Sequence, residues 1–576
     1  MNQNRAKIQV NRVYNHGIPL IKGVRHDASF YYYDVYSKDG ELIGENIAGK
    51  AVFLKEGFYD LFTSRIKYRL EFENPHGIIV DNLYIGREYF TERKILELTE
   101  YGVMVDKDTA PILIKDLINQ ESLITPKVTY DSLGWYEKDG VTAFLGLNRA
   151  IGIDACYVGG WDDVKKAGSR DKWINMVEEH VIGRPPLELA LAIGFASTAI
   201  GFIKKIIPTL DYMMLHAVGN SSCGKSTVAE LIVSMGSYPK ISGKNRSMMM
   251  DYSSTEAALI NTLSQISGMP CAIDEASLCS NKNKSLLIYQ LSGGRERARL
   301  SANAELKESG FWDLVIFSTG EHDILDYCER NVGLYARYLS ICLDYWTDSA
   351  EHSEAIKNIV SSNYGHITED FAEFLLGFKE NDKTNEIIII YEYWREYLEN
   401  KFEDARKSSI ITKRLSGNLA VLLTSLMLGA ECIDINVDVE SVADLLVSQC
   451  SMEKLDETDI AESAYEVLMQ EIVKQPDKIL PKDNKNYPNT IWGVRYNNEK
   501  AKLPDGRQTN GSLLILTSVL ESILRRNGFN DKNIILKEWR KEGILISHKD
   551  RFKSKHSINI NGTLFIIVLH ILILII

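Results

Sequence analysis

The sequence predicts a multidomain α/β protein whose central domain holds a phosphate-binding loop. Three neighbouring segments carry this prediction: residues 213–218 are apolar, residues 219–226 read Gly-Asn-Ser-Ser-Cys-Gly-Lys-Ser, and residues 227–236 suit an amphipathic helix. A strand, a glycine-framed loop and a helix in this order form a cradle where backbone N–H groups and the positive end of the helix dipole face anionic oxygens. The chain is therefore expected to bind a nucleoside triphosphate.

The residues of this loop have separate tasks. Glycine at 219 and 224 allows the turn and the close approach of the backbone to a ligand. Lys225 can reach the β- and γ-phosphates, and the Ser226 hydroxyl can ligate Mg²⁺. The residues expected to bind the nucleotide here are Gly219, Asn220, Ser221, Ser222, Cys223, Gly224, Lys225, Ser226 and Thr227.

Length and composition narrow the classes of protein. A chain of 576 residues exceeds what one core supports, so several domains are expected. The net charge of −12 argues against a wholly basic nucleic-acid coat, so any polyanion site must be a local patch. The cysteines are scattered without a Cys-x-x-Cys pair, and the start of the chain is polar. A cytoplasmic location is therefore expected, without disulfides, structural zinc or a signal peptide.

Two apolar stretches resemble membrane spans. Residues 187–203 include Glu188 and end at Lys204-Lys205, so a buried helix is expected there rather than a span. Residues 563–576 are shorter than the ~20 residues that a span needs. They are either a last buried strand or the end of a disrupted reading frame, and no membrane partner is expected.

Glycine, proline and polar residues divide the chain into segments. Helices are expected at 93–101, 110–120, 387–399, 420–428, 512–526 and 531–542. The expected domains are an N-terminal α+β domain (1–125), a linking segment (126–186), a nucleotide-binding core (187–345), a helical lid (346–473), a linker (474–510) and a winged-helix-like domain (511–576).

A carboxylate pair follows the loop by about fifty residues. The short apolar run 271–273 ends in Asp274-Glu275. Asp274 would hold Mg²⁺, and Glu275 would orient or deprotonate the attacking water. The next largely apolar run, 312–317, ends in Ser318-Thr319, whose hydroxyls could contact the γ-phosphate or the water. A simple strand-end turn is the alternative.

Arginines occur at three places that could serve phosphates. Arg295, Arg297 and Arg299 share one face of an extended segment, which suits a nucleic-acid backbone, a neighbouring subunit's nucleotide or a solvated surface. Arg337, or Arg330 near it, could be an arginine finger, and an ordinary ion pair is the alternative. Arg414 opens an apolar helix and could reach back to bound nucleotide, or could lie at a solvated helix end.

The C-terminal segment is locally basic. Residues 537–556 hold seven Lys or Arg against three acids. Helix, turn, helix and a basic extended segment form the pattern of a winged helix-turn-helix, which contacts DNA. A solvated basic face is the alternative. The expected DNA contacts in this domain are Arg540, Lys541, Lys549, Arg551, Lys553 and Lys555.

Together these motifs resemble the ATPase family catalogued as the domain of unknown function numbered 927. The loop, the Ile-Asp-Glu-Ala strand, the Leu-Ser-x-Gly-x-x-Arg-x-Arg hairpin and the Ser-Thr-Gly-Glu strand end carry the resemblance. The Lys-Glu-Trp-Arg-Lys-Glu-Gly-Ile-Leu and Lys-Asp-Arg-Phe segments resemble the closing domain of replicative helicases of staphylococcal cassette chromosomes. Those helicases are relatives of the minichromosome-maintenance helicases, which are AAA+ ATPases that form hexamers around DNA.

The resemblance implies a role for each matching residue. Lys225 with Ser226 would be the Walker A pair, and Asp274 with Glu275 the Walker B pair. Thr319 would be a sensor, although the minichromosome-maintenance enzymes use Asn there. Arg337 would be the finger, Arg414 the second sensor, and residues 293–311 the hairpin in the DNA channel. The apolar end beyond residue 561 departs from the family, so the last strand of the winged helix is expected to be altered or missing.

The expected function is that of an ATP- and Mg²⁺-dependent DNA helicase, assembled as a hexameric ring on single-stranded or forked DNA. It would serve replication of a mobile genetic element or phage. One alternative is a DNA-binding AAA+ ATPase that acts as a loader or regulatory switch. The other is the helicase component of a helicase–primase, which would need a primase or initiator partner.

Overall fold

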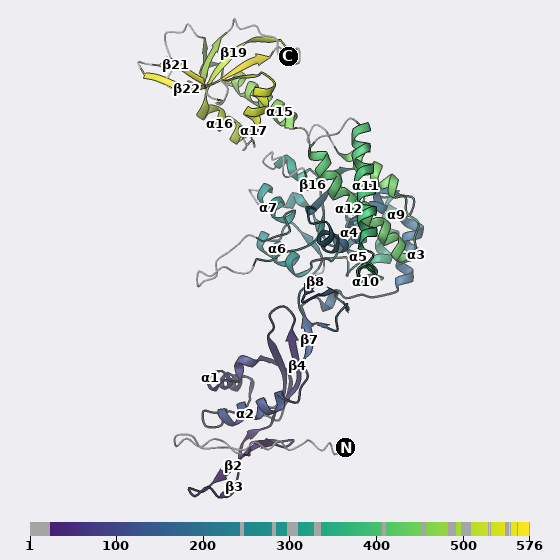
Figure 1. Cartoon of the computed structure of the whole chain (residues 1–576), viewed down its shortest axis with the longest axis vertical. Helices are drawn as coiled ribbons and strands as arrows, with labels where there is room; N and C mark the ends of the chain where they lie inside the picture. Colours follow the sequence, from purple (N-terminus) through teal and green to yellow (C-terminus); the bar gives the residue numbers. More distant parts are fainter. Residues whose placement is uncertain are drawn as a thin grey trace. The chain divides into compact units, whose positions relative to one another are not determined.

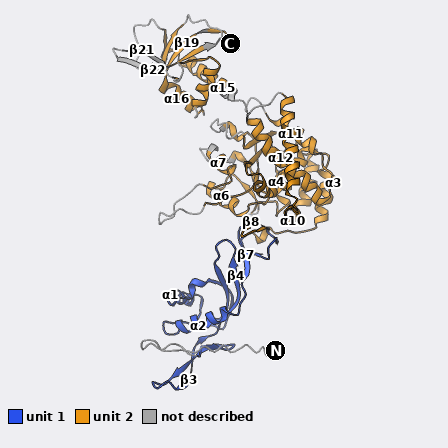
Figure 2. Cartoon of the chain, in the orientation of Figure 1, with its two compact units in different colours: residues 1–132, 145–160 blue, residues 133–144, 161–576 orange. Residues whose placement is uncertain are grey.

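The structure is a computed structural model that describes residues 23–241, 247–278, 284–296, 309–327, 336–405, 410–450, 457–481, 491–496, 508–527, 529, 532–547, 552, 554–560 and 563–574. The chain divides into two compact units, one from residues 1–132 and 145–160 and one from residues 133–144 and 161–576 (Figure 2).

The first unit contains two sheets. One has the order β1-β2-β3 and the other the order β11-β7-β4-β5-β6. The strands of these sheets are β1 (Arg25–His26), β2 (Phe30–Tyr36), β3 (Leu42–Lys50), β4 (Val52–Asp60), β5 (Ile66–Glu73), β6 (Ile79–Gly86), β7 (Lys127–Tyr130) and β11 (Cys156–Tyr157). The short strand β10 (Ala150–Ile151) belongs to neither sheet. The helical segments are η1 (Arg87–Tyr89), α1 (Glu92–Ile95), η2 (Leu96–Tyr101) and α2 (Ala110–Glu121).

Helix α2 forms where the sequence predicts it, and it packs against β4. The buried Gln120 amide joins them: Oε1 accepts from Leu54 N and Nε2 donates to Val52 O, each at 2.8 Å. An amide offers both a donor and an acceptor, so it satisfies both backbone groups. The helix predicted at 93–101 is instead split into α1 and the 3₁₀ segment η2.

The second unit is organised around a parallel sheet with the order β13-β14-β15-β12-β16. Its strands are β12 (Met213–Val218), β13 (Met249–Asp251), β14 (Ala272–Asp274), β15 (Val315–Gly320) and β16 (Tyr338–Cys342). Parallel strands covered on both faces are buried along their length, as β15 is, and as β12 is up to its last residue. Their carboxyl ends meet at one edge, and this brings the loop after β12 beside the ends of β14 and β15.

Helices surround this sheet (Figure 1). They are α3 (Arg170–His180), α4 (Pro185–Ile206), α5 (Lys225–Ser234), α6 (Glu256–Gln265), α7 (Lys284–Leu291), α9 (Ala350–Val360), α10 (Ile367–Glu380), α11 (Thr384–Asp404), α12 (Ile410–Ile433) and α13 (Val439–Gln449). The helices predicted at 387–399 and 420–428 lie inside α11 and α12. Smaller elements are β8 (Gly134–Lys138), β9 (Val141–Leu145), η3 (Asp162–Val164), η4 (Ala276–Leu278) and η5 (Ile324–Tyr327).

Helix α4 confirms the prediction of a buried helix at 187–203. Every residue of that stretch is buried, and Ser197 Oγ donates to Val315 O of β15 at 2.7 Å. Within the described residues, two helices are long and apolar enough to cross a membrane, Pro185–Ile206 and Ile411–Ile433, and their most apolar windows are 94% and 78% buried. Core helices meet the same test, so both are weak evidence for a membrane span.

The C-terminal part combines three helices with a sheet of order β17-β18-β19-β22-β20, in which β21 also pairs with β22. Its elements are α15 (Glu457–Lys474), η6 (Pro476–Lys478), β17 (Ile479–Pro481), β18 (Gly493–Tyr496), β19 (Thr509–Leu516), α16 (Thr517–Arg526), α17 (Lys532–Lys541), β20 (Leu545–Ile546), β21 (Ser554–Ile560) and β22 (Thr563–Leu574). Helix α15 belongs to this core, because Trp539 Nε1 donates to Ala461 O at 2.7 Å.

Three expectations for this region are corrected. The helix predicted at 512–526 begins only at Thr517, because residues 512–516 alternate between two cores: Leu513 and Ile515 face one and Leu514 the other. Strands β17 and β18 and the start of β19 lie within the segment expected to be a linker. The last strand, expected to be altered or missing, is not missing, since β22 pairs with β19, β20 and β21.

Candidate functional site

The loop between β12 and α5 has the backbone geometry of a ligand cradle. Gly224 caps α5 with φ +95°, and a Cβ there would lie 2.9 Å from Thr347 Oγ1. Glycine is therefore required both by conformation and by space. Ser222 also has a positive φ, of 70°. Left-handed residues such as these occur in the loops that form anion-binding nests.

Lys225 begins α5 and is folded back over the loop. Its Nζ donates to Gly219 O and Asn220 O, each at 2.8 Å. Its third contact is Cys223 Sγ, at 3.6 Å. Phosphate oxygens carry more negative charge and can take over these bonds.

The two acidic residues meet Thr319 at the carboxyl edge of the sheet. Thr319 Oγ1 donates to Asp274 Oδ1 and accepts from Glu275 N, the latter at 3.1 Å. Thr319 is buried, and it donates its one hydroxyl hydrogen to Asp274. Glu275 has φ +56°, which is rare for a residue with a side chain and occurs most often at functional sites.

One cavity of about 490 Å³ collects these groups. Six non-glycine residues in the described part of the chain have a positive φ, and two of them, Ser222 and Glu275, line this cavity. Of the predicted site residues, the cavity is lined by Ser221, Ser222, Gly224, Lys225, Ser226, Thr227, Asp274, Glu275 and Thr319.

Seven lining residues escaped the sequence analysis. Ser221 Oγ donates to Glu321 Oε1 at 2.9 Å, which connects the loop to the end of β15. Glu321 follows Thr319 by two positions, so its place at the same strand end was a usable signal. The lining residues from 276 onwards that were not predicted include Ser277, Glu321, Ser353, Glu354 and Lys357. The last three belong to α9, which no local pattern relates to the loop.

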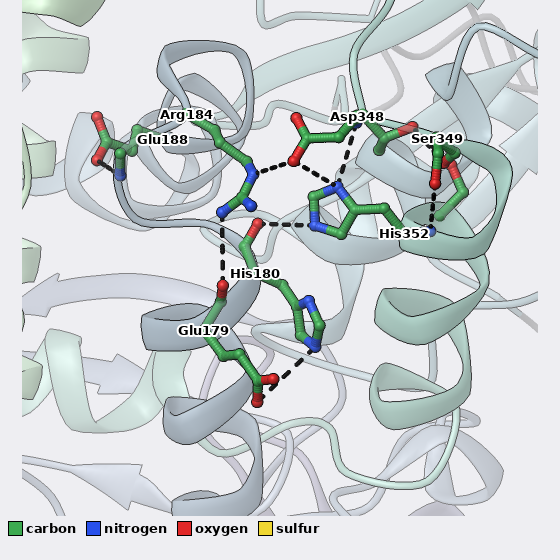
Figure 3. A network of polar contacts seen from close by, with 10 residues as sticks. Glu179, His180, Arg184, Glu188, Asp348, Ser349 and His352 are labelled. Carbon is green, nitrogen blue, oxygen red and sulfur yellow. Dashed lines mark hydrogen bonds and ion pairs between the residues drawn. The ribbon is translucent and has the colours of Figure 1, made fainter.

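Helix α9 is held beside the loop by a polar network (Figure 3). Arg184 Nε donates to Asp348 Oδ2 at 2.7 Å, and His352 Nε2 donates to His180 O at 3.0 Å. Burial lowers the pKa of His352, and Asp348 N donates to its Nδ1 at 3.2 Å, so the ring is neutral. Lys357 Nζ lies 3.5 Å from Glu230 Oε1 of α5. These contacts fix α9 at its N-terminal turn and further along its length.

A buried chain of hydrogen bonds supports the end of β15. His216 Nε2 lies 3.1 Å from His322 O, and a carbonyl can only accept, so Nε2 carries the hydrogen. Burial lowers the pKa of His216 to about 4, and the neutral ring therefore accepts at Nδ1 from Ser318 Oγ at 3.0 Å. Tyr252 OH lies 2.8 Å from the same Oγ. These hydrogen bonds join β12, β15 and the residue that follows β13, at the position next to Thr319 in the sequence.

Arg337 and Arg414, the two arginines expected to act on nucleotide, do not line this cavity. Arg337 Nη2 donates to Asp211 Oδ1 and Arg414 Nη2 to Asp211 Oδ2, each at 3.1 Å. Asp211 precedes β12, whereas the loop follows it, so about six residues at ~3.3 Å each separate the arginines from the loop. Arg414 does not line the cavity of its own chain, which corrects the expectation that it reaches back to nucleotide there.

The remaining predicted contacts are only partly described. Arg295 is exposed, and its backbone forms an antiparallel bridge with Phe311. Arg540 of α17 lies 5.7 Å from the Phe552 ring, and Lys541 Nζ lies 3.0 Å from Glu538. Lys555 belongs to β21. Arg297, Arg299, Arg330, Lys549, Arg551 and Lys553 lie outside the described residues.

The fold and the site define a multidomain α/β protein with a parallel sheet, a polar cavity at its carboxyl edge and a C-terminal helical domain. Residues 24–310 match the family model described as domain of unknown function, DUF927, and residues 459–571 match the Cch helix turn helix domain. The resemblance expected from the motifs is thus confirmed: the chain carries a DUF927 region over residues 24–310 and a Cch-type helix-turn-helix region over residues 459–571.

One solved structure extends this likeness over the chain. It is described as "SCCmec type IV Cch - active helicase" and matches with a TM-score of 0.71 and 19% sequence identity. The match covers 95% of this chain and 96% of that chain, so the two proteins share a fold over nearly their whole length. Among curated proteins no match was found.

Proposed function

We propose that this protein is an ATP-dependent DNA helicase of the AAA+ class that works as a hexameric ring in the replication of a mobile genetic element or phage. The observation that carries the proposal is the single cavity in which the Lys225 loop meets Asp274, Glu275 and Thr319. The Cch-type helix-turn-helix match and the fold shared with a helicase support DNA as the partner.

The cavity fits a nucleoside triphosphate with Mg²⁺. The loop and the N-terminus of α5 suit phosphate oxygens, and the Lys225 ammonium adds the matching charge. Ser226 and Asp274 would hold the magnesium ion, since hydroxyl and carboxylate oxygens are the ligands it prefers. The metal would supply charge neutralisation on the phosphates.

Glu275 would orient and deprotonate the attacking water. Its backbone is fixed by the bond from its N–H to Thr319, so its carboxylate is aimed from a constrained position. Thr319 would act as the sensor, because its hydroxyl touches both acidic residues. A general base placed in this way contributes typically 10²–10⁴-fold to a rate.

DNA would bind at two places. The helices α15, α16 and α17 of the closing domain would engage duplex or forked DNA, with phosphate contacts from the basic residues that follow. The segment 293–311 would project into the ring channel toward single-stranded DNA. A cytoplasmic location follows from this role.

Strand displacement on a labelled fork tests the proposal. The wild-type protein should separate the strands only with ATP and Mg²⁺, whereas Lys225→Ala should lose nucleotide binding and unwinding together. Glu275→Gln should still bind ATP but hydrolyse it about 100-fold more slowly or worse. ATP hydrolysis without strand separation would favour the loader or switch, and primer synthesis would favour a helicase–primase.

A further inference from the structure

One face of α9 forms a wall of the nucleotide cavity, and the proposed function does not yet use it. The residues of this helix that line the cavity are Ala350, Ser353, Glu354 and Lys357. Their spacing of i, i+3, i+4 and i+7 puts all of them on one side of the helix. The wall therefore presents one positively charged side chain, Lys357, to the space where a nucleotide would lie.

The described lining of the cavity is poor in positive charge. Its charged residues are two lysines, Lys225 and Lys357, and four carboxylates, Asp274, Glu275, Glu321 and Glu354. A triphosphate is itself polyanionic, so an excess of carboxylates in a partly enclosed site opposes its binding. Lys225 is already assigned to the phosphates. Among the described residues, Lys357 is then the remaining lining side chain whose positive charge can offset the ligand.

Lys357 lies at the phosphate end of the cavity. Its Nζ is 3.5 Å from Glu230 Oε1. Glu230 follows Ser226 by four positions on α5, so both side chains lie on the same face of that helix. Ser226 is the proposed ligand of Mg²⁺, and such an ion bridges the outer two phosphates of a triphosphate. Lys357 is therefore on the side of the cavity where the terminal phosphate would bind.

The ion pair with Glu230 is one that Lys357 can leave. Its 3.5 Å separation exceeds the roughly 2.7–3.2 Å of a usual N–H···O hydrogen bond. Glu230 is buried, and its Oε2 has no hydrogen-bond partner among the residues that the structure describes. The Lys357 side chain keeps 34% of its surface exposed. An ammonium group on a flexible four-carbon stem can turn from this carboxylate to a phosphate oxygen.

We propose that Lys357 binds the terminal phosphate of the nucleotide held by its own chain, and that its side chain leaves Glu230 to do so. The inference rests on the proposed function, because it needs a triphosphate in the cavity. Helix α9 can stay in place, since the bonds from Arg184 to Asp348 and from His352 to His180 hold its N-terminal turn. Hydrogen bonds between an ammonium group and a phosphate are among the strong ones, so the exchange favours the bound state.

Equilibrium binding of ATP and of ADP, each with Mg²⁺, to the full-length protein tests this assignment. Lys357→Met keeps a long stem without the charge, and it should weaken ATP binding roughly 10-fold to 100-fold, the range for loss of a hydrogen bond to a charged group. ADP lacks the terminal phosphate, so its dissociation constant should stay near the wild-type value. Lys357→Arg keeps the charge and should retain most of the affinity for ATP.

Glu230→Gln distinguishes this role from a structural one, because it breaks the same ion pair from the other side. It should leave ATP binding at or above the wild-type level, since it releases Lys357. If the pair served only to pack α9 against α5, both variants would weaken the binding of ATP and ADP alike, and that result would overturn the inference. Unchanged ATP binding by a folded Lys357→Met protein would overturn it too.

Lys205→Met is the matched control, because Lys205 also has a side chain that is 34% exposed and is paired with a glutamate, Glu137. It should bind both nucleotides as the wild-type protein does. If Lys357→Met does not fold, Lys357→Gln answers the same question. A wild-type protein that binds no ATP would instead refute the proposed function.

Discussion

The backbone N–H of Glu275 donates to the Thr319 hydroxyl at 3.1 Å. The same hydroxyl donates its hydrogen to Asp274, so one small side chain joins the residue proposed for the metal to the residue proposed for the water. Because the hydroxyl both accepts and donates here, a methyl group cannot replace it without loss of both hydrogen bonds.

Thr319→Val therefore separates binding from hydrolysis. The variant should bind ATP close to normally, because the Lys225 loop is intact, and should hydrolyse it roughly 10-fold to 100-fold more slowly, as after loss of other outer-shell partners. Thr319→Ser keeps the hydroxyl and should retain most activity. Nucleotide binding by fluorescence and phosphate release measured side by side check this, and weakened binding by the valine variant would assign Thr319 to the nucleotide contacts instead.

Arg337→Ala tests the proposed finger. The variant should bind ATP nearly normally and hydrolyse it on the order of 10³-fold more slowly, the contribution of such arginines in other phosphoryl-transfer enzymes. Mixed with Glu275→Gln protein it should regain some hydrolysis, measured as turnover per mixed oligomer. If mixed oligomers form without regaining hydrolysis, Arg337 is not the finger, and Arg330 becomes the next candidate.

Replacing Lys549, Arg551, Lys553 and Lys555 by alanine should weaken DNA binding across sequences. Each lost phosphate contact lowers the slope of log affinity against log salt by about 0.9, so the slope should fall by up to roughly 3 or 4. Titrations at several salt concentrations measure this, with basal ATP hydrolysis unchanged. Lys474→Ala is the control, since Lys474 is paired with Glu471. An unchanged slope in the fourfold variant would identify a merely solvated basic face.

The buried His216 predicts a pH dependence of stability. Burial lowers its pKa from 6.5 to about 4, so below pH 6.5 the unfolded chain binds a proton that the folded chain does not. The contribution of His216 to the free energy of unfolding should therefore be constant above that pH and fall by up to about 3 kcal/mol as the pH approaches 4.

Urea unfolding of the second unit at a series of pH values measures this effect. His216→Gln should flatten the dependence between pH 6.5 and 4, whereas His76→Gln, at an exposed position, should leave it unchanged. If the His216→Gln variant keeps the wild-type pH dependence of stability, that dependence comes from other titratable groups.

Much of the fold could be predicted because short stretches of sequence indicate it. Strand β12, the phosphate-binding loop and helix α4 are each indicated by neighbouring residues: an apolar run, two glycines, and a long stretch of apolar residues. The start of α16 was misplaced for the opposite reason. In residues 512–516, Leu513 and Ile515 pack into one hydrophobic core and Leu514 packs into another on the opposite face of the strand. The sequence alone does not show that a core lies on each face.

The sequence by itself determined the residue types and spacing of the loop and of the Asp274-Glu275 pair, because strand, turn and helix preferences act over a few residues. Only the tertiary structure decided what those groups meet. Asp211 pairs with Arg337 at a separation of 126 positions and with Arg414 at 203, and α9 enters the cavity wall from beyond the sheet. Such contacts form only when particular faces of the sheet and the helices pack together, and the packing of the whole core determines which faces do so.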